Sequence, residues 1–219
     1  MKQMDTLASN LFFLLRCQAA RHTHDIATRS SRRAISYRRI WSRIERATAR
    51  LQGEWQVMPG DTVVYWGNAH ADALILYFAV ARCGAQLLPL ERAEVRALAD
   101  RVWRMHPPRA VIHDEGLQPA PGLPAGVVAT LPELLAVRCH HQERAIEDAS
   151  LTSLIDLQVE DGKLVERCYS LAALSTQTAQ AEVAAAHETV EVRDVLFDVP
   201  LLAARIFPAL ARADTVSFS

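Results

Sequence analysis

No apolar run in this sequence approaches the roughly 20 residues that a membrane-spanning helix requires. The longest candidate covers residues 69–80 and is interrupted by His70 and Asp72. The apolar stretch 11–15 is too short for a secretory signal, and no small-residue cleavage site follows it closely. We therefore expect a soluble, cytoplasmic protein without a membrane span. The Arg- and Ser-rich, acid-poor start of the chain also resembles an organelle transit peptide, which remains the alternative.

Cysteine is scarce and scattered. The four cysteines form no Cys-x-x-Cys pair, so they indicate neither a zinc site nor a redox pair and fit a reducing compartment. The run Cys139-His140-His141 does not predict a metal site, because adjacent side chains point in different directions. The chain also lacks a Gly-x-Ser-x-Gly elbow, a His-Glu-x-x-His motif and a Walker-type loop. The cysteines are Cys17, Cys83, Cys139 and Cys168.

Acidic residues are rare in the first 50 positions. Lys and Arg number 11 there against 3 Asp and Glu, whereas the rest of the chain holds 13 against 22. Such an asymmetry can indicate contact with nucleic acid or a membrane surface. Here the arginines alternate with apolar residues typical of a core, so we interpret them as solvated helix faces and expect no nucleic-acid partner.

The clearest helix is predicted over residues 37–51. Its apolar side chains recur at helical spacing and its arginines fall elsewhere, which is typical of a helix with one face against a core. Ser36 is placed to cap the start of this helix, and Gly53 is placed to end it. Another helix is predicted over residues 7–20. The apolar stripe consists of Tyr37, Ile40, Trp41, Ile44, Ala47 and Leu51.

Short β-rich runs alternate with helical patterns over residues 62–113. Strands are predicted at 62–66, 86–90 and 109–113, and helices at 69–82 and 91–105. The alternation predicts an α/β fold with a parallel-rich sheet flanked by helices. His113 and Asp114 end the third strand, a place where ligands often bind in such sheets. The alternative is that both are polar strand-end residues facing water.

The second part of the chain begins with a hairpin signal. Predicted strands at 154–160 and 164–169 flank Asp161-Gly162, a dipeptide that favours a tight type I′ turn. Ser170 can cap a helix that reaches about residue 187, and a helix at 201–211 contains Pro208. Further strands are predicted at 195–199 and 215–218. We divide the chain into a first region, 1–137, a possible linker, 138–150, and a second region, 151–219.

Several phrases recur here in the order and spacing of a known family. They are Ile35-Ser36-Tyr37, Met58-Pro59-Gly60-Asp61-Thr62-Val63, Trp66-Gly67-Asn68, Cys83-Gly84-Ala85-Gln86 and Leu88-Pro89-Leu90. In these the chain resembles the N-terminal domain of the adenylate-forming superfamily, which holds acyl- and aryl-CoA synthetases, peptide-synthetase adenylation domains and luciferases. The resemblance covers residues 30–113 densely and also absorbs residues 11–30, which argues against a transit peptide. None of these phrases performs chemistry, so the resemblance predicts the fold and leaves the function open.

The phosphate-binding loop of that superfamily is degenerate in this chain. Family members place a Ser/Thr/Gly-rich loop ending in Pro-Lys-Gly between two hairpin strands, where backbone N–H groups approach the phosphates. The corresponding stretch, 157–166, keeps only Gly162 and Lys163, beside Glu160 and Asp161. Each acidic side chain repels a triphosphate by roughly 1 kcal/mol or more at such distances. We expect a solvated turn here, with Lys163 as a surviving phosphate ligand being the alternative.

Two further departures concern catalysis. Family members carry a His or an aromatic residue that gates the acyl site after a Pro and an apolar pair, and the resemblance puts Ala203 at that position, in Pro200-Leu201-Leu202-Ala203. Alanine has neither a ring to stack nor a proton to exchange. The chain also stops at Ser219, whereas the family continues with an adenine pocket, ribose- and magnesium-binding acids and a lid with a catalytic Lys. We therefore expect no catalytic residues, cofactor or metal in this chain alone.

Three functions follow from the resemblance and these departures. The leading hypothesis is a non-catalytic relative of the synthetases that acts through association with itself, with a full-length synthetase or with another protein of acyl or aryl metabolism. A sheet cut short near residues 215–218 would leave an edge strand that favours such pairing. One alternative is a subunit of a split AMP-forming acyl- or aryl-CoA ligase. The other is an acyl- or aryl-binding protein that keeps a cleft without chemistry.

Overall fold

The structure is a computed structural model that describes residues 11–117, 119, 126–136, 141, 142, 144–146, 148, 150–182, 189–193 and 195–219, without the side chains of 179–182. Its larger sheet has six strands in the order β6-β5-β3-β4-β7-β8. Neighbouring strands are parallel except in the β7–β8 hairpin. The prediction of an α/β fold with a parallel-rich sheet is confirmed. The strands are β3 (Thr62–Trp66), β4 (Gln86–Pro89), β5 (Ala110–His113), β6 (Val127–Thr130), β7 (Thr152–Glu160) and β8 (Lys163–Ser170).

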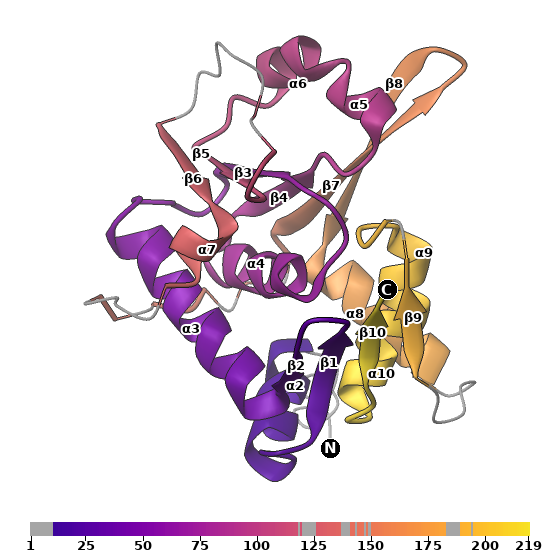
Figure 1. Cartoon of the computed structure of the whole chain (residues 1–219). Helices are drawn as coiled ribbons and strands as arrows, with labels where there is room; N and C mark the ends of the chain where they lie inside the picture. The colour runs from indigo at the N-terminus through magenta and orange to yellow at the C-terminus, as the bar shows by residue number, and fades with distance from the viewer. Residues whose placement is uncertain are drawn as a thin grey trace.

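Helices cover both faces of this sheet (Figure 1). Successive side chains of a strand point to opposite faces, so Val63 packs with α3 and α4 while Val64 packs with α5 and α6. Every residue of α4 except Asp72 is buried, because this helix lies between the larger sheet and the C-terminal helices. None of the described helices is long and apolar enough to cross a membrane. The helices on this sheet are α3 (Tyr37–Gly53), α4 (Ala71–Arg82), α5 (Ala93–Arg96), α6 (Ala99–Met105) and α7 (Leu131–Leu134).

A smaller sheet joins the two ends of the described chain. Its order is β2-β1-β10-β9, with β10 parallel to both of its neighbours and β2 antiparallel to β1. We did not predict β1, β2 or β9, because each has at most five residues and becomes a strand only by pairing with a distant segment. Helices α2 (Leu11–Arg21) and α8 (Leu171–Glu182) complete the fold. The strands are β1 (Ile26–Ser30), β2 (Ala34–Ser36), β9 (Val190–Val192) and β10 (Val216–Phe218).

Two predictions about the C-terminal strands are wrong. Strand β10 is not an edge strand, because β1 and β9 pair with its two sides and bury Val216 and Phe218. The predicted strand at 195–199 is instead an irregular segment that leads into α9 (Val199–Leu201). Asp198 begins that helix by accepting a hydrogen bond from the Leu201 N–H at 3.2 Å.

Two predicted long helices are interrupted. The helix expected at 91–105 is divided into α5 and α6 around Leu98, whose φ of −105° and ψ of 20° are not helical. The helix expected at 201–211 contains a π-helical turn, η1 (Leu202–Ile206), followed by α10 (Phe207–Ala211). Pro208 has no N–H to donate to the preceding turn, which accounts for an irregularity immediately before it.

Candidate functional site

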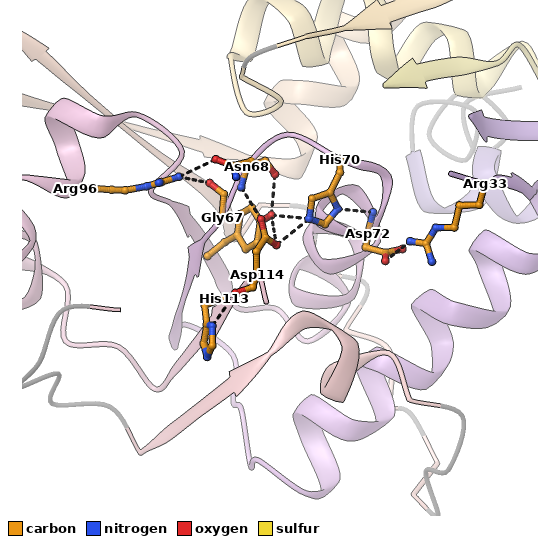
Figure 2. A network of polar contacts seen from close by, with 9 residues as sticks. Arg33, Gly67, Asn68, His70, Asp72, Arg96, His113 and Asp114 are labelled. Carbon is orange, nitrogen blue, oxygen red and sulfur yellow. Dashed lines mark hydrogen bonds and ion pairs between the residues drawn. The ribbon is translucent and has the colours of Figure 1, made fainter. Parts of the chain in front are cut away.

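The carboxyl ends of β3 and β5 bring a polar network together (Figure 2). Trp66 and His113 are paired at the ends of these parallel strands, so the residues that follow them meet at one edge of the sheet. There, Asp114 accepts hydrogen bonds from His70 Nε2 at 2.8 Å and from the Tyr65 hydroxyl at 2.9 Å, both on Oδ1. Its Oδ2 accepts the backbone N–H of Asn68 at 2.8 Å. Position 114, predicted as a candidate site, is thus the centre of a network.

The protonation states in this network follow from its hydrogen bonds. Burial raises the pKa of Asp114, but the hydrogen bonds from His70, Asn68 and Tyr65 outweigh it, so the pKa lies below its ordinary value. Burial, and then the charge of Asp114, raise the pKa of Tyr65, which keeps the hydroxyl protonated as a donor. His70 Nδ1 accepts the Asp72 N–H at 3.2 Å, so its hydrogen is on Nε2.

This geometry fixes the loop after β3 against the end of β5. Both nitrogens of His70 form hydrogen bonds within the network. The loop is fixed from the other side by Arg96, which donates to the Gly67 carbonyl and lies over the Trp66 ring, 5.8 Å from its centroid. A side chain at Gly67 would overlap the Tyr65 ring, so the loop admits only glycine there. The His113 Nδ1 hydrogen-bonds the Asp114 carbonyl at 3.0 Å, and its ring points away from the Asp114 carboxylate (Figure 2).

A second charged cluster follows β4 and was missed by the sequence interpretation. Glu91 accepts the backbone N–H groups of Leu196 at 3.2 Å and Phe197 at 2.9 Å, and so ties the end of β4 to the segment before α9. Burial raises the pKa of Glu91 to about 7, against the lowering effect of these two hydrogen bonds. This carboxyl group therefore titrates close to neutral pH.

Arg92, beside it, forms an ion pair with Asp156 at 2.9 Å and a longer one with Asp198 at 3.6 Å. The Asp156 side chain is 2% exposed, and its other oxygen accepts the Gln158 amide at 2.7 Å. A signal for this cluster exists in the sequence, because an Asp in the middle of an apolar strand requires a partner when the strand is buried. The identity of that partner depended on the tertiary structure.

The hairpin tip adopts the predicted turn. Strands β7 and β8 are paired as far as Glu160 and Lys163, and the two intervening residues, Asp161 and Gly162, have φ values of 50° and 73°. Two consecutive left-handed residues are what a type I′ turn requires, so this prediction is confirmed. Only two residues therefore separate the paired strands at the position where the resemblance places a phosphate-binding loop.

Two acidic side chains near the tip have partners. Glu160 forms an ion pair with Arg167 at 2.7 Å, and Glu166 is hydrogen-bonded to Nε2 of His106, the residue that follows α6, at 3.0 Å. Among the described residues, Lys163 has no ion-pair partner and is exposed. A nest that holds phosphates needs several consecutive N–H groups facing one point. The two-residue turn provides at most the N–H groups of Asp161 and Gly162 outside the strand pairing.

Ala203 lies inside the fold. It belongs to the π-helical turn η1, which packs against α8, and it is 2% exposed. Its methyl group fills space in the core. That this position corresponds to the acyl gate of the family, and that the gate is degenerate here, stay predictions.

A cavity lies at the opposite, amino-terminal edge of the larger sheet. Its volume is about 510 Å³, and its lining includes Gln52, Val57, Met58, His141 and Arg144. Gln52 holds this wall in place through hydrogen bonds with the backbone of Arg144, at 2.7 and 2.8 Å. Cys139 and His140 lie outside the described residues. Within the described part of the chain, no three His, Cys, Asp or Glu side chains are grouped as metal ligands.

Solved structures place this fold among the N-terminal subdomains of adenylate-forming enzymes. The N-terminal subdomain of Klebsiella oxytoca NpsA, solved with 3-hydroxyanthranilyl-AMSN, superposes with a TM-score of 0.77 at 18% identity, covering 96% of this chain and 54% of that one. A Mycobacterium tuberculosis fatty acyl CoA synthetase gives 0.76 at 14% identity, covering 96% and 44%. A putative long-chain-fatty-acid CoA ligase from Rhodopseudomonas palustris gives 0.76 at 18% identity, covering 95% and 57%. The chain thus spans about half the length of these proteins.

The AMP-binding enzyme family matches residues 15–191, and this chain belongs to that family. In a comparison with curated proteins, no sequence matches the chain. The resemblance noted from the sequence is confirmed at the level of the family and the fold.

Proposed function

We propose that this chain retains the fold of an AMP-binding domain without its nucleotide chemistry and acts by binding a protein partner. The closed tip of the β7–β8 hairpin is the observation that carries the first half of this proposal. Its strands are paired up to a two-residue turn formed by Asp161 and Gly162. A triphosphate at this tip would meet at most two free N–H groups, which are too few for a phosphate-binding nest.

Two features support association. The described surface carries a group of five arginines (Arg32, Arg33, Arg39, Arg43 and Arg46), of which only Arg33 and Arg43 form ion pairs, both with Asp72. Among the described residues, strand β9 has a hydrogen-bonded neighbour on one of its two sides, which suits pairing with another chain on the other side. The partner in this proposal is a second copy, a full-length synthetase or another protein of acyl or aryl metabolism. The three cysteines in the described part of the chain are free, and one of them is exposed, which supports the cytoplasm as its compartment.

The proposal is tested by incubating the purified chain with ATP, magnesium and a panel of fatty and aryl acids, and by measuring pyrophosphate release. We expect no release above the buffer control, whereas an active adenylate-forming enzyme assayed in parallel releases it. Formation of an acyl-adenylate by the chain alone, or ordered nucleotide at residues 160–163 in soaked crystals, would refute the proposal. Light scattering after size exclusion tests association, and a clean monomer that binds no synthetase counts against it.

A small-molecule binder is the second candidate, and the cavity beside α3 is the observation that favours it. Its volume of about 510 Å³ is within the range of small-ligand sites, and its lining mixes apolar and polar side chains. Calorimetry with fatty acids, aryl acids, their CoA esters and AMP distinguishes the two candidates. Binding that is lost on changing Met58→Trp would favour the cavity, and absence of any heat signal would exclude it.

A further inference from the structure

Closely spaced arginines cover the β1–β2 hairpin and the adjoining face of α3. Arg32 and Arg33 lie in the turn between β1 and β2, and Arg39, Arg43 and Arg46 recur at helical spacing along α3. We call these five residues the arginine surface. Burial lowers the pKa of Arg43, and the charges of Arg33, Arg46 and Arg39 lower it further, against the opposing charge of Asp72. The arginines are thus close enough to repel one another.

A single carboxylate compensates part of this charge. Asp72, in the first turn of α4, forms ion pairs with Arg33 and with Arg43, the latter at 3.2 Å (Figure 2 shows the pair with Arg33). Arg32 and Arg39 are exposed and have no ion-pair partner among the described residues. The surface therefore keeps an excess of positive charge, and the repulsion within it is relieved when an anionic surface binds.

The surroundings of the arginines distinguish between kinds of polyanion. Nucleic-acid binding surfaces usually interleave exposed aromatic side chains for base stacking, but Tyr37 and Trp41 are buried here and the Trp41 N–H is bound to Glu45 at 2.6 Å. Peripheral membrane binding usually adds exposed apolar side chains that enter the lipid. None of the exposed large apolar residues of the described chain lies on the hairpin or on α3; they are Phe13, Met58, Met105 and Val128.

The carboxylates of a protein fit the arginine surface better than nucleic acid or a membrane surface does. Asp72 already shows the arrangement, because its two oxygens are each held by a different guanidinium group. Guanidinium groups bind carboxylates through paired N–H donors, and at an exposed site this recognition works without apolar contact. We propose that the arginine surface docks a carboxylate-rich surface of a partner protein. This inference rests on the proposed role in association, and it identifies the face of this chain that binds the partner.

A fluorescein-labelled deca-glutamate peptide is the probe for this inference. Its binding is measured by fluorescence anisotropy at about 50 mM and about 300 mM NaCl, where screening differs. The test variant R32E/R39E reverses two exposed charges and leaves both ion pairs of Asp72 intact. The control variant R101E/R104E reverses two exposed arginines on α6, at the other side of the molecule. A third variant, R32K/R39K, keeps the charge.

We expect the chain to bind the peptide more tightly at low salt, and R32E/R39E to bind it about tenfold more weakly. R101E/R104E should stay within about twofold of the unmodified chain. R32K/R39K keeps the charge but loses the paired N–H donors, so its affinity should lie between those of the unmodified chain and R32E/R39E. If R32E/R39E and R101E/R104E weakened peptide binding equally, the inference would be overturned, because the effect would then depend on the net charge of the chain and not on the arginine surface. Absence of peptide binding, or tighter binding of RNA or of vesicles with anionic phospholipid, would also overturn it. These results leave the adenylation assay unaffected, so failure of this inference is distinguishable from failure of the proposed function.

Discussion

Replacing Glu91 by glutamine should remove a pH dependence from the stability of the protein. Glu91 has an ordinary pKa of 4.5, and burial raises it to about 7 in the folded chain. Between these values the folded protein holds a proton that the unfolded chain releases. The stabilising contribution is therefore complete below about pH 4.5, and it is lost as the pH rises through about 7.

The magnitude follows from the size of the shift. A change of one pKa unit corresponds to about 1.4 kcal/mol, so the loss between the two pKa values amounts to at most about 3 kcal/mol. Glutamine cannot titrate, and its single acceptor oxygen satisfies only one of the two N–H groups, of Leu196 and Phe197, that Glu91 binds. That leaves a penalty of about 1 kcal/mol or more that does not vary with pH.

The assay is urea unfolding followed by tryptophan fluorescence at a series of pH values between about 5 and 8. At each pH, the free energy of unfolding of E91Q is subtracted from that of the unmodified chain. This difference should fall by about 2 kcal/mol or more as the pH rises across this range. E94Q, which changes an exposed Glu on α5, is the matched control and should leave the pH dependence unchanged. If the difference between the chain and E91Q were constant across the series, the reasoning about Glu91 would be refuted.

Three other substitutions test the network, the turn and the buried ion pair. D114N removes the charge that accepts three hydrogen bonds and should lower the free energy of unfolding by about 2 kcal/mol, with faster hydrogen exchange in residues 67–70 as its specific signature. G162V places a branched side chain at a φ of 73° and should cost about 1–2 kcal/mol in urea unfolding, whereas D161G should be tolerated. R92M leaves Asp156 buried without its cation and should lower the free energy of unfolding by about 3–5 kcal/mol. R92M/D156L should recover most of this stability in a thermal melt. A double variant no more stable than R92M would contradict this account.

The local sequence was sufficient for the elements whose pattern lies within one segment. The apolar stripe of α3, the β-rich run of β3 and the Asp161-Gly162 turn each carry their signal within a few residues, and the structure confirms them. The three-residue strands β2 and β9 have no such pattern. Their geometry depends on β1 and β10, which come from opposite ends of the described chain. For the same reason β10 was taken for an edge strand.

The candidate site likewise has one part that the sequence predicted and another that it did not. Asp114 was found because parallel strands bring their carboxyl ends to one edge, which the order of elements already implied. Its hydrogen bonds with Tyr65 and His70 were not predictable, because they depend on the close approach of a loop to the end of a neighbouring strand. Glu91 was overlooked entirely, since nothing in its neighbourhood indicates that it would accept N–H groups more than a hundred positions away.

The family, the α/β alternation and the acidic two-residue turn at 160–163 could be predicted, because each depends on contiguous residues and on local backbone preference. Which charges are compensated became clear only from the folded chain. Asp72 holds two arginines, and Asp156 holds Arg92. Ion pairing depends on distances across the fold, and the order of residues along the chain does not contain those distances.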